Sequence, residues 1–458
     1  MDFYFEADKR RAELVRDLQE LVRIPSLYDE TTVTENAPFG KEVRNALDWV
    51  LNKGKQDGFI TKDVDGYAGI VEFGKGEEIM GVLGHLDIVP VGVGWSKDPF
   101  GAEIEDGYLY GRGSGDDKGP TIAAYYAMKI LKDLGIEMNK RVYLITGCDE
   151  ESGMACMHYY QDHAPIPNFG FVPDASFPVI YGEKGIMNLR LSSEVTTVIK
   201  KLIAGERPNI VIGQADATVD AQLKQEMFEF YLSTHNLKGT ASQSSDGAVY
   251  SIEGIFSHGS LPQNGINSAW HLLNFIGSAY NDQFAHTTAV LLNDYRGKEL
   301  GVKVHGSHMG DLTVNFGIVN ISDSHASIVL DLRYPQETDA ETIQKQILAA
   351  LEKSGSPLKM ELIQNKDPLF VNPKSELVST LENIYRKHTG DMTTPLLTMG
   401  GGTYARTLPN CVAFGCEFPL RPAKEGVGEA HQKDEGIEIE SLILATAIYA
   451  EAIFELTR

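Results

Sequence analysis

The sequence predicts an α/β fold with a second, α+β domain inserted into the first. Up to about residue 184, short apolar segments alternate with segments of helical periodicity, the pattern of a sheet covered by helices on both faces. From 185 to 394 the strand-like segments become more polar and alternating, as in residues 328–333. After 395 the chain returns to Gly-rich turns, an apolar strand and a long amphipathic helix. We therefore expect one domain from residues 1–184 and 395–458, and an inserted domain from residues 185–394.

The periodicity of the sequence also predicts the individual elements. Strands are short apolar runs, and the second of them is nearly all apolar, which indicates burial on both faces. In the first domain the expected strands cover residues 69–73, 79–83, 141–146, 169–172 and 411–414. The expected helices of both domains cover residues 6–22, 41–57, 119–134, 267–280, 339–353 and 434–456.

The composition excludes several classes of protein. A formal charge of −23 over 458 residues argues against nucleic-acid and anionic-membrane partners, which require basic surfaces. No apolar stretch is long enough to span a bilayer, and the charged N-terminal segment lacks the apolar centre of a signal peptide. The four cysteines show no Cys-x-x-Cys spacing, so we interpret them as reduced thiols. These features predict a cytoplasmic protein.

Side chains suited to metal binding follow the predicted strands of the first domain. His85 and Asp87 directly follow one apolar strand, Glu150 and Glu151 follow another, and Asp174 follows a third. Ligands of open α/β sheets gather at the carboxyl ends of the strands. A further aspartate, Asp116, lies in Gly-Arg-Gly-Ser-Gly-Asp-Asp-Lys-Gly, a Gly-rich segment that opens a predicted helix. The sequence therefore predicts one cluster of these side chains at one edge of the sheet.

Each of these residues alone has a structural alternative. His85 could be a hydrogen-bonded histidine at a strand end, and Asp116 or Asp117 could cap the following helix. The Gly-rich segment could also cradle a phosphate, but it lacks the Gly-Lys-Ser/Thr ending of a P-loop and carries two aspartates instead. Cys148 could be a nucleophile, although a buried structural thiol is the better interpretation. The convergence of several ligands on one edge favours a cation site.

The types of ligand narrow the choice of cation. One imidazole with several carboxylates and no thiolate suits Zn²⁺, Mn²⁺ or Co²⁺. The carboxylates outnumber those that one ion requires. We therefore expect two divalent metal ions that share a bridging aspartate.

Taken together, the motifs resemble a known family. His85-x-Asp87, Gly94-Trp95 with Asp98-Pro99-Phe100, the Gly-Arg-Gly-x-x-Asp-x-Lys-Gly segment and Asp149-Glu150-Glu151 are similar to those of the co-catalytic zinc peptidases. That family includes carnosinases, acetylornithine deacetylase, succinyl-diaminopimelate desuccinylase and aminoacylase, and the chain most resembles its bacterial dipeptidase PepV subgroup. The resemblance covers essentially the whole chain. It implies a catalytic domain of the phosphorylase/hydrolase-like type, with a mixed sheet, and an inserted lid domain.

The resemblance assigns a role to each residue of the cluster. Asp116, followed by a cis peptide, would bridge the two metals, and Glu150 would be the general base. Asp87 would support the metal ligand His85. The full set of metal ligands implied by the resemblance is His85, Asp116, Glu151, Asp174 and, before the last helix, His431.

The resemblance also assigns residues of the lid and of a Gly-rich turn. His258 would contact the oxygen of the tetrahedral intermediate, and Arg333 would hold the C-terminal carboxylate of the substrate. Asn209 would also approach the intermediate, although its neighbours depart from the family pattern. Gly401 and Thr403 belong to the Gly-rich turn near the substrate. A capping His258, an Arg333 paired with a surface acid and a plain sharp turn are the structural alternatives.

The implied activity is metal-dependent hydrolysis of dipeptides, including β-alanyl dipeptides such as carnosine, by a water held between two metals. An N-acyl amino-acid deacylase or desuccinylase on the same scaffold is the alternative. A third possibility is a metal-binding but inactive member with a regulatory role, which would not need Glu150. The lid is large enough to supply His258 within one chain, so a monomer is plausible.

Overall fold

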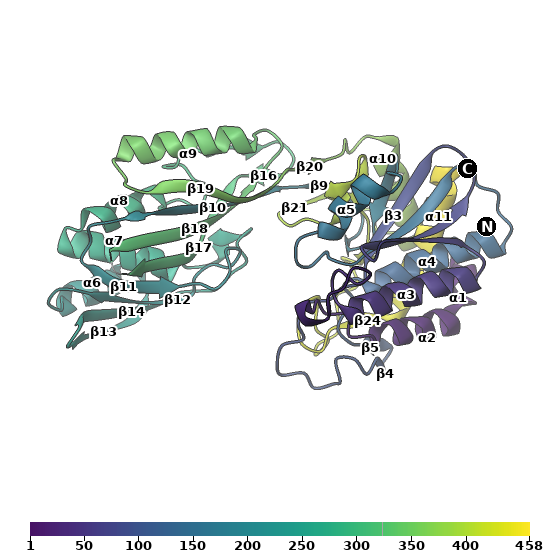
Figure 1. The fold of residues 1–458 in the computed structure, drawn as a ribbon, viewed down its shortest axis with the longest axis horizontal. Helices are drawn as coiled ribbons and strands as arrows, with labels where there is room; N and C mark the ends of the chain where they lie inside the picture. The colour runs from purple at the N-terminus through teal and green to yellow at the C-terminus, as the bar shows by residue number, and fades with distance from the viewer. Residues whose placement is uncertain (323) are drawn as a thin grey trace. The chain divides into compact units, whose positions relative to one another are not determined.

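The computed structural model describes residues 1–322 and 324–458 and divides the chain into two compact units (Figure 1). Unit 1 comprises Met1–Tyr181, Val371–Leu397 and Gly402–Arg458, and unit 2 comprises Gly182–Phe370 and Thr398–Gly401. The predicted second boundary, at residue 394, would have placed helix α10 (Glu376–Thr389) in the inserted domain. In the structure α10 belongs to unit 1, where Lys387 and His388 bind Glu451 of the last helix.

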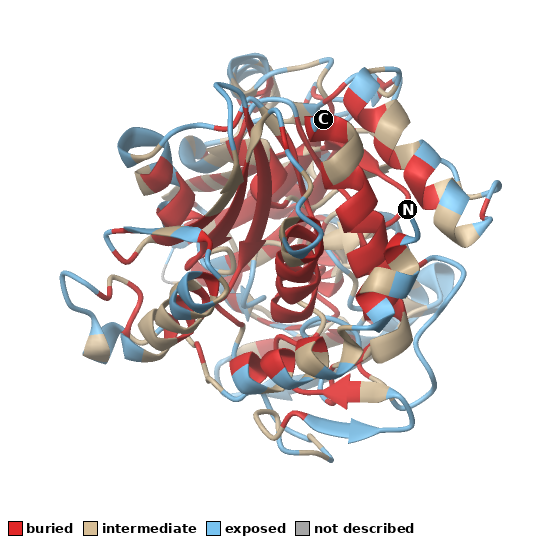
Figure 2. Ribbon diagram, turned by 90° about the vertical axis from the view of Figure 1, so that its right-hand side faces the viewer, coloured by how far each residue is buried: buried red, intermediate tan, exposed pale blue. Residues whose placement is uncertain are grey.

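Unit 1 is built around strands β1-β2-β6-β3-β7-β22 of a mixed sheet, whose order continues through β9 to β20, with β21 paired to β9. β9 and β21 each begin in unit 1 and end in unit 2, and β20 belongs to unit 2. Strands β6, β3 and β7 run parallel, and β22 runs parallel to β7. Figure 2 shows that these central strands are buried, while the helices around them carry both buried and exposed residues. The sheet strands are β1 (Ile60–Val64), β2 (Ala68–Gly74), β3 (Ile79–His85), β6 (Arg141–Gly147), β7 (Phe169–Val172), β9 (Ile180–Glu183), β20 (Leu369–Phe370), β21 (Leu397–Met399) and β22 (Cys411–Ala413).

Helices lie on both faces of this sheet, as the alternation of strands and helices predicts. Gly84 of β3 faces Thr121 of α4, whereas Gly147 of β6, on the opposite face, lies against Tyr404 of η3. The helices of unit 1, besides α10, are α1 (Phe3–Asp8), α2 (Arg11–Val22), α3 (Lys41–Gln56), α4 (Lys118–Asp133), α5 (Ala155–His163), α11 (Ile439–Thr457) and the short η1 (Glu30–Thr32) and η3 (Tyr404–Thr407). Its remaining strands are β4 (Glu103–Glu105), β5 (Tyr108–Tyr110), β8 (Ala175–Ser176), β23 (Cys416–Glu417) and β24 (Gly436–Glu438).

Two predicted helices of this unit differ from the structure. The helix expected over 6–22 is broken into α1 and α2, because α1 packs on α11 while α2 packs on α4. The last helix begins at Ile439 instead of residue 434. Residues 436–438 form β24 instead, which pairs with β5. The side chains of Asp434 and Glu435 accept hydrogen bonds from backbone amides of distant segments, so this stretch is held in an extended path.

Unit 2 is an α+β unit with an eight-stranded antiparallel sheet in the order β13-β14-β12-β11-β17-β18-β10-β19. In β18 (His325–Tyr334), Ile328, Leu330 and Leu332 point into the core. Asp331 and Arg333 therefore lie on the other face, because successive strand residues alternate. The other sheet strands are β10 (Gly185–Glu194), β11 (Ile199–Ala204), β12 (Gln214–Val219), β13 (Lys238–Ser244), β14 (Gly247–Glu253), β17 (Thr313–Ser322) and β19 (Lys359–Lys366).

The core of unit 2 lies between one face of this sheet and its helices, which contribute Phe228, Leu272, Phe284 and Ile347 to one buried cluster. The helices are α6 (Gln225–His235), α7 (Ser268–Tyr280), α8 (Gln283–Leu291), α9 (Ala340–Ser354) and the short η2 (Pro262–Asn264). Strands β15 (His305–Gly306) and β16 (Gly310–Asp311) form a separate hairpin. The helices expected over 267–280 and 339–353 correspond to α7 and α9 within one residue at each end.

Two expectations about the chain as a whole can be compared with the structure. All four cysteines are buried, and burial raises the pKa of Cys148 well above its usual value, as fits a structural thiol. Among the described residues, no helix is long and apolar enough to cross a membrane.

Candidate active site

The carboxyl ends of three parallel strands bring the predicted ligands together in unit 1. His85 is the last residue of β3, and it pairs in register with Gly147, the last residue of β6. Glu150 and Glu151 follow β6 after two more residues, and Asp174 follows β7 after one. Asp116 lies in the loop that opens α4. The predicted gathering of these side chains at one edge of one sheet is thus present in the structure.

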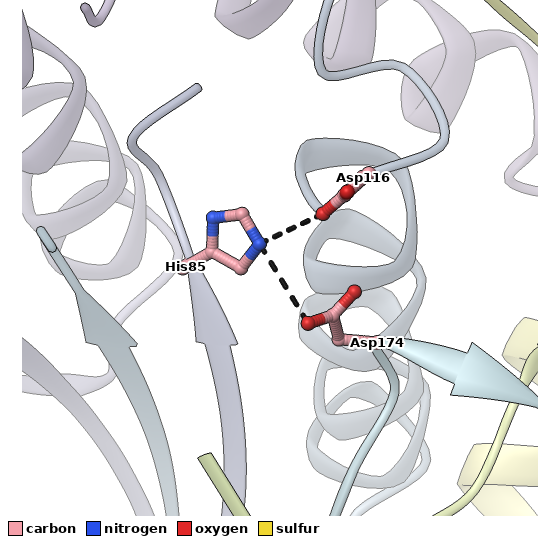
Figure 3. Close-up of side chains that lie close together, drawn as sticks. All are labelled: His85, Asp116 and Asp174. Atoms are coloured by element: carbon pink, nitrogen blue, oxygen red, sulfur yellow. Dashed lines mark hydrogen bonds and ion pairs between the residues drawn. The ribbon is translucent and has the colours of Figure 1, made fainter. Parts of the chain in front are cut away.

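A first group of possible metal ligands consists of His85, Asp116 and Asp174 (Figure 3). The Nε2 atom of His85 lies 2.9 Å from Oδ1 of Asp116 and 3.7 Å from Oδ2 of Asp174. The other ring nitrogen, Nδ1, lies 2.9 Å from the backbone carbonyl oxygen of Asp87. Because a carbonyl only accepts, Nδ1 carries a proton, and Nε2 is therefore the nitrogen that can bind a metal ion beside the two carboxylates.

A second group consists of Asp116, Glu151 and His431. The Nε2 atom of His431 lies 2.9 Å from Oδ2 of Asp116 and 3.1 Å from Oε1 of Glu151. His431 comes from an exposed segment near the C-terminus, in which its own φ is 66°. The histidine is therefore supplied by a loop more than 270 residues away along the chain from Glu151, its partner in this group.

Asp116 belongs to both groups, and each of its two oxygens faces a different histidine. The next residue, Asp117, turns away from the groups. Its Oδ2 accepts hydrogen bonds from the backbone N–H of His85 and from the hydroxyl of Thr121. The peptide bond between Asp116 and Asp117 is cis. The geometry therefore distinguishes the two adjacent aspartates and gives the shared position to the first.

Asp87 holds the backbones of the two adjacent glutamates, whose carboxylates differ in their contacts. Its Oδ1 accepts the backbone N–H of Glu150 and its Oδ2 that of Glu151, both at 3.0 Å. The carboxylate of Glu151 binds His431, whereas no described side chain hydrogen-bonds to the carboxylate of Glu150. Burial, with the nearby charge of Glu151, raises the pKa of Glu150 to about 8.

The electrostatics of the cluster suit the binding of cations. Burial, followed by the charge of Asp116, raises the pKa of Asp174 well above its usual value. Hydrogen bonds to Asp116 and Glu151 raise the pKa of His431 to about 10. In His85, burial lowers the pKa, but hydrogen bonds to Asp116 and Asp87 outweigh it. Buried carboxylates that crowd one another, and histidines that gain protons beside them, fit a site for cations with nitrogen and oxygen ligands.

A cavity of about 160 Å³ opens beside the first group and gives it access to solvent or to a ligand. Asp116 and Asp174 line it, together with Glu417 of β23. Glu417 accepts a hydrogen bond from the hydroxyl of Ser176 at 2.6 Å. The ligands are therefore reachable in unit 1 and are not sealed within its core.

Unit 2 brings together the three residues that were predicted in the inserted domain, Asn209, His258 and Arg333. The backbone carbonyl oxygen of Asn209 accepts the backbone N–H of Gly259, the residue after His258. Arg333 donates from Nε to Asp331 and from Nη1 to the carbonyl of Gly400, each within 3.0 Å. The charge of Arg333 also lowers the pKa of His258, after the larger effect of burial. Arg333 is thus paired with an acid, as its structural alternative expected, but this acid, Asp331, is buried and does not lie on the surface.

The ring orientation of His258 follows from its contacts with Ser260. The backbone N–H of Ser260 donates to Nδ1 of His258 at 3.1 Å, and the Ser260 hydroxyl lies 2.7 Å from the same atom. An atom that accepts an N–H carries no proton of its own, so the neutral ring carries its proton on Nε2. His258 therefore offers an N–H donor, the form that an oxygen with developing negative charge requires.

The Gly-rich turn is divided between the units. Gly401 ends the short segment of unit 2, whereas Thr403 belongs to unit 1, where its hydroxyl caps η3 by accepting the N–H of Ala405. This contact agrees with the alternative of a structural turn. The substrate-binding roles of Gly401, Thr403 and Asn209 stay predictions.

Sequence reasoning missed three residues that support these clusters. Arg112 and Glu435 form a buried ion pair between the loops of Asp116 and His431, and Asp331 binds Arg333. Arg112 lies inside the Gly-rich motif, and Asp331 lies two residues before Arg333 on the same strand face, so both positions carried a signal. Glu435 carried none, because it was assigned to the predicted helix.

Comparisons with known proteins agree with this geometry. The pattern of Peptidase family M20/M25/M40 matches residues 81–455. The Bacillus subtilis protein named "Putative dipeptidase YtjP" is 38% identical over 474 residues, covering 100% of both chains. A Staphylococcus epidermidis protein named "Putative dipeptidase" is 39% identical over 464 residues, covering 97% of both.

Solved structures show the same fold at low sequence identity. Human carnosine dipeptidase 1 has a TM-score of 0.59 at 16% identity, with 99% of this chain and 98% of that chain covered. An M20 family metallo-carboxypeptidase from Sulfolobus solfataricus has a TM-score of 0.58 at 16% identity, with 96% and 98% covered. The predicted fold class is confirmed, and the chain belongs to peptidase family M20/M25/M40 as a metallopeptidase.

Proposed function

We propose that this protein is a dipeptidase that hydrolyses the peptide bond of dipeptides with two divalent metal ions. The observation that carries the proposal is the position of Asp116, whose two oxygens face two separate groups of ligands, with Glu150 unengaged beside them. The names of the full-length relatives support dipeptides as the substrates. β-Alanyl dipeptides such as carnosine are part of the proposed range.

The first group, His85, Asp116 and Asp174, would hold one ion, and Asp116, Glu151 and His431 would hold the other. When bound, two such ions lower the pKa of a water molecule toward 7 and polarise the scissile carbonyl. Zn²⁺ is our first choice, and Mn²⁺ and Co²⁺ also suit one imidazole with carboxylates in each group.

Glu150 is the proposed general base. It would accept a proton from the attacking water and then deliver that proton to the leaving amine. Its pKa of about 8 would keep much of it protonated at neutral pH. Cations in both groups would lower this pKa, because a nearby positive charge favours the carboxylate, and would so make Glu150 available as a proton acceptor.

Residues of unit 2 would act on the other parts of the substrate. The neutral His258 would donate its Nε2–H to the oxygen of the tetrahedral intermediate. Among the described residues, the hydrogen bonds of the Arg333 guanidinium use Nε and Nη1, and Nη2 would bind the C-terminal carboxylate of the dipeptide. Its buried partner Asp331 fixes the guanidinium plane.

A matched pair of variants tests the proposal, because Glu150 and Glu151 are adjacent and chemically identical. Glu150→Gln should lower kcat by about 10²–10⁴-fold and keep both ions, since the general base contributes that much to rate. Glu151→Gln should lose one ion. Full activity of Glu150→Gln would overturn the assignment of the base.

The substrate end is tested with a panel of dipeptides, carnosine, tripeptides and N-acetyl amino acids, each with Zn²⁺ or Mn²⁺. We expect turnover of dipeptides. Hydrolysis of the N-acetyl amino acids alone would instead identify a deacylase. The expectation of a monomer stays a prediction, which light scattering of the purified protein would test.

A further inference from the structure

We propose that the buried ion pair of Arg112 and Glu435 is a positioning device for the second metal group. It ties the loop that carries Asp116 to the loop that carries His431, and so sets the affinity for the ion held by Asp116, Glu151 and His431. The inference rests on the proposed function, because it requires that group to bind a metal ion. Arg112 and Glu435 would not touch the substrate themselves.

Glu435 holds the loop of Asp116 through its carboxylate. Its Oε1 accepts the backbone N–H groups of Gly115 and Asp116 at 2.9 and 3.2 Å. Its own carbonyl oxygen accepts the N–H of Gly111 at 2.9 Å. Because the Asp116 amide is one of the groups held, a shift of Glu435 moves the shared ligand directly.

Arg112 holds the loop of His431 through its guanidinium. Nη1 donates to Oε2 of Glu435 at 2.6 Å and to the carbonyl of Gln432 at 3.1 Å, and Nη2 donates to the carbonyl of His431 itself at 3.2 Å. The guanidinium also lies 5.1 Å from the ring of Trp95. A planar fork with several donors suits this multiple contact, which a lysine ammonium could not reproduce in one geometry.

The burial of the pair makes it sensitive to the loss of either partner. Arg112 and Glu435 are each 1% exposed. Removing one partner of such a pair leaves an uncompensated buried charge, which forces the surrounding backbone to rearrange. Here the surrounding backbone is that of Asp116 and His431.

The two metal groups depend on this pair to different extents. His85 ends a fully buried strand and is oriented by Asp87, and Asp174 follows another buried strand, so the first group keeps two anchored ligands without Arg112. His431 lies in the exposed segment 429–433, and its side chain is 53% exposed. The first buried residues after that segment are Asp434 and Glu435. The loss of the pair should therefore affect the second ion more than the first.

The test is a titration of the metal-free, full-length protein with Mn²⁺, followed by electron paramagnetic resonance, which distinguishes coupled ion pairs from isolated ions. The wild type should bind two equivalents. Arg112→Met and Glu435→Gln should keep the affinity for one ion and lose about 10–100-fold for the other, the usual cost of removing a group that orients a ligand. Arg112→Lys should fall between, since it keeps the charge and loses the fork.

Lys53→Met is the matched control, because Lys53 pairs with the buried Asp17 at 2.9 Å between α3 and α2, and its other ion-pair partners, Glu13 and Asp57, are not proposed ligands. It should lower the Tm and leave both affinities unchanged. If Arg112→Met does not fold, Glu435→Gln and Arg112→Lys decide the question.

The outcomes separate the two proposals. If the wild type binds two ions and the Arg112 and Glu435 variants bind both with unchanged affinity, this inference alone is overturned. An equal loss of both ions would also overturn it, because the effect would not be specific to the second group. Fewer than two equivalents in the wild type would overturn the proposed function and this inference with it.

Discussion

The polar clusters of the two units differ in how their charges are balanced. In unit 1, Asp116, Glu150, Glu151 and Asp174 crowd around two histidines, and burial raises the pKa values of Glu150 and Asp174. In unit 2, Arg333 is neutralised by the buried Asp331, and burial lowers the pKa of His258. The first cluster requires added positive charge, whereas the second is already neutral and presents hydrogen-bond donors.

This difference corresponds to a division of chemical labour. A crowded set of carboxylates binds cations and moves protons, and a neutral set of donors binds the anionic parts of a substrate and of the intermediate. Variants of the proposed metal ligands in unit 1 should therefore change metal content, while variants in unit 2 should leave it unchanged and alter only kinetics.

The largest expected effect comes from Asp116→Ala, which removes the ligand common to both metal groups. We expect loss of both ions and a fall in kcat/KM of about 10³–10⁴-fold, because metal ions supply several kcal/mol to such reactions. Metal content by atomic absorption and dipeptide turnover measure the two effects. Retention of both ions would show that the two metal groups do not share Asp116 as a ligand, and would contradict the contrast drawn between the units.

The next effect comes from His258→Ala in unit 2. The variant should lose about 10²–10³-fold in kcat, the usual result of removing one donor to an oxyanion, with both ions kept. His325→Ala is a suitable control, because His325 is an exposed histidine that pairs with Glu194 at the start of β18. Loss of an ion in His258→Ala would contradict the division between the units.

A smaller effect is expected from Arg333→Met, which should raise KM for dipeptides by about 10–100-fold, since a charge-assisted contact contributes up to about 3 kcal/mol. With a dipeptide amide, which lacks the carboxylate, the KM of this variant should be close to that of the wild type. Arg190→Met removes an exposed arginine that pairs with Glu361 in the same sheet, and should have almost no effect. An equal rise in KM for acid and amide would argue against carboxylate binding.

The smallest expected effect is a pH dependence of the stability of the metal-free protein, which should arise from His431 in unit 1. Hydrogen bonds to Asp116 and Glu151 raise the folded-state pKa of His431 to about 10, above its unfolded value of about 6.5. The stabilisation is therefore complete below pH about 6.5 and is lost as the pH rises toward 10. In EDTA, the wild-type Tm should fall over this range more steeply than that of His431→Gln.

Metal affinity should change in the opposite direction over the same pH range, because an ion must displace the proton of His431. The lowered pKa of His258 gives unit 2 no comparable contribution at neutral and alkaline pH. Parallel Tm curves for the wild type and His431→Gln would show that this pairing does not contribute to stability.

The sequence allowed the framework of unit 1 to be predicted, because its central strands are continuous apolar runs and each ends at a polar ligand. His85, Glu150, Glu151 and Asp174 could be placed at one sheet edge from topology alone. His431 could be assigned only by resemblance, since its loop has no periodicity and is brought to Asp116 by tertiary contacts.

Other features depended on contacts between distant segments, which local patterns do not record. The break between α1 and α2 arises from packing on two different helices. The late start of α11 arises because Asp434 and Glu435 bind distant backbone amides. Charged residues at helical spacing favoured a helix there, and only the folded chain shows why they form an extended segment.

The most direct test of the two-ion centre is anomalous diffraction from a crystal of the protein grown with Mn²⁺. This centre should give two anomalous peaks, one among His85, Asp116 and Asp174 and one among Asp116, Glu151 and His431. A single peak, or two peaks of which only one contacts Asp116, would contradict it.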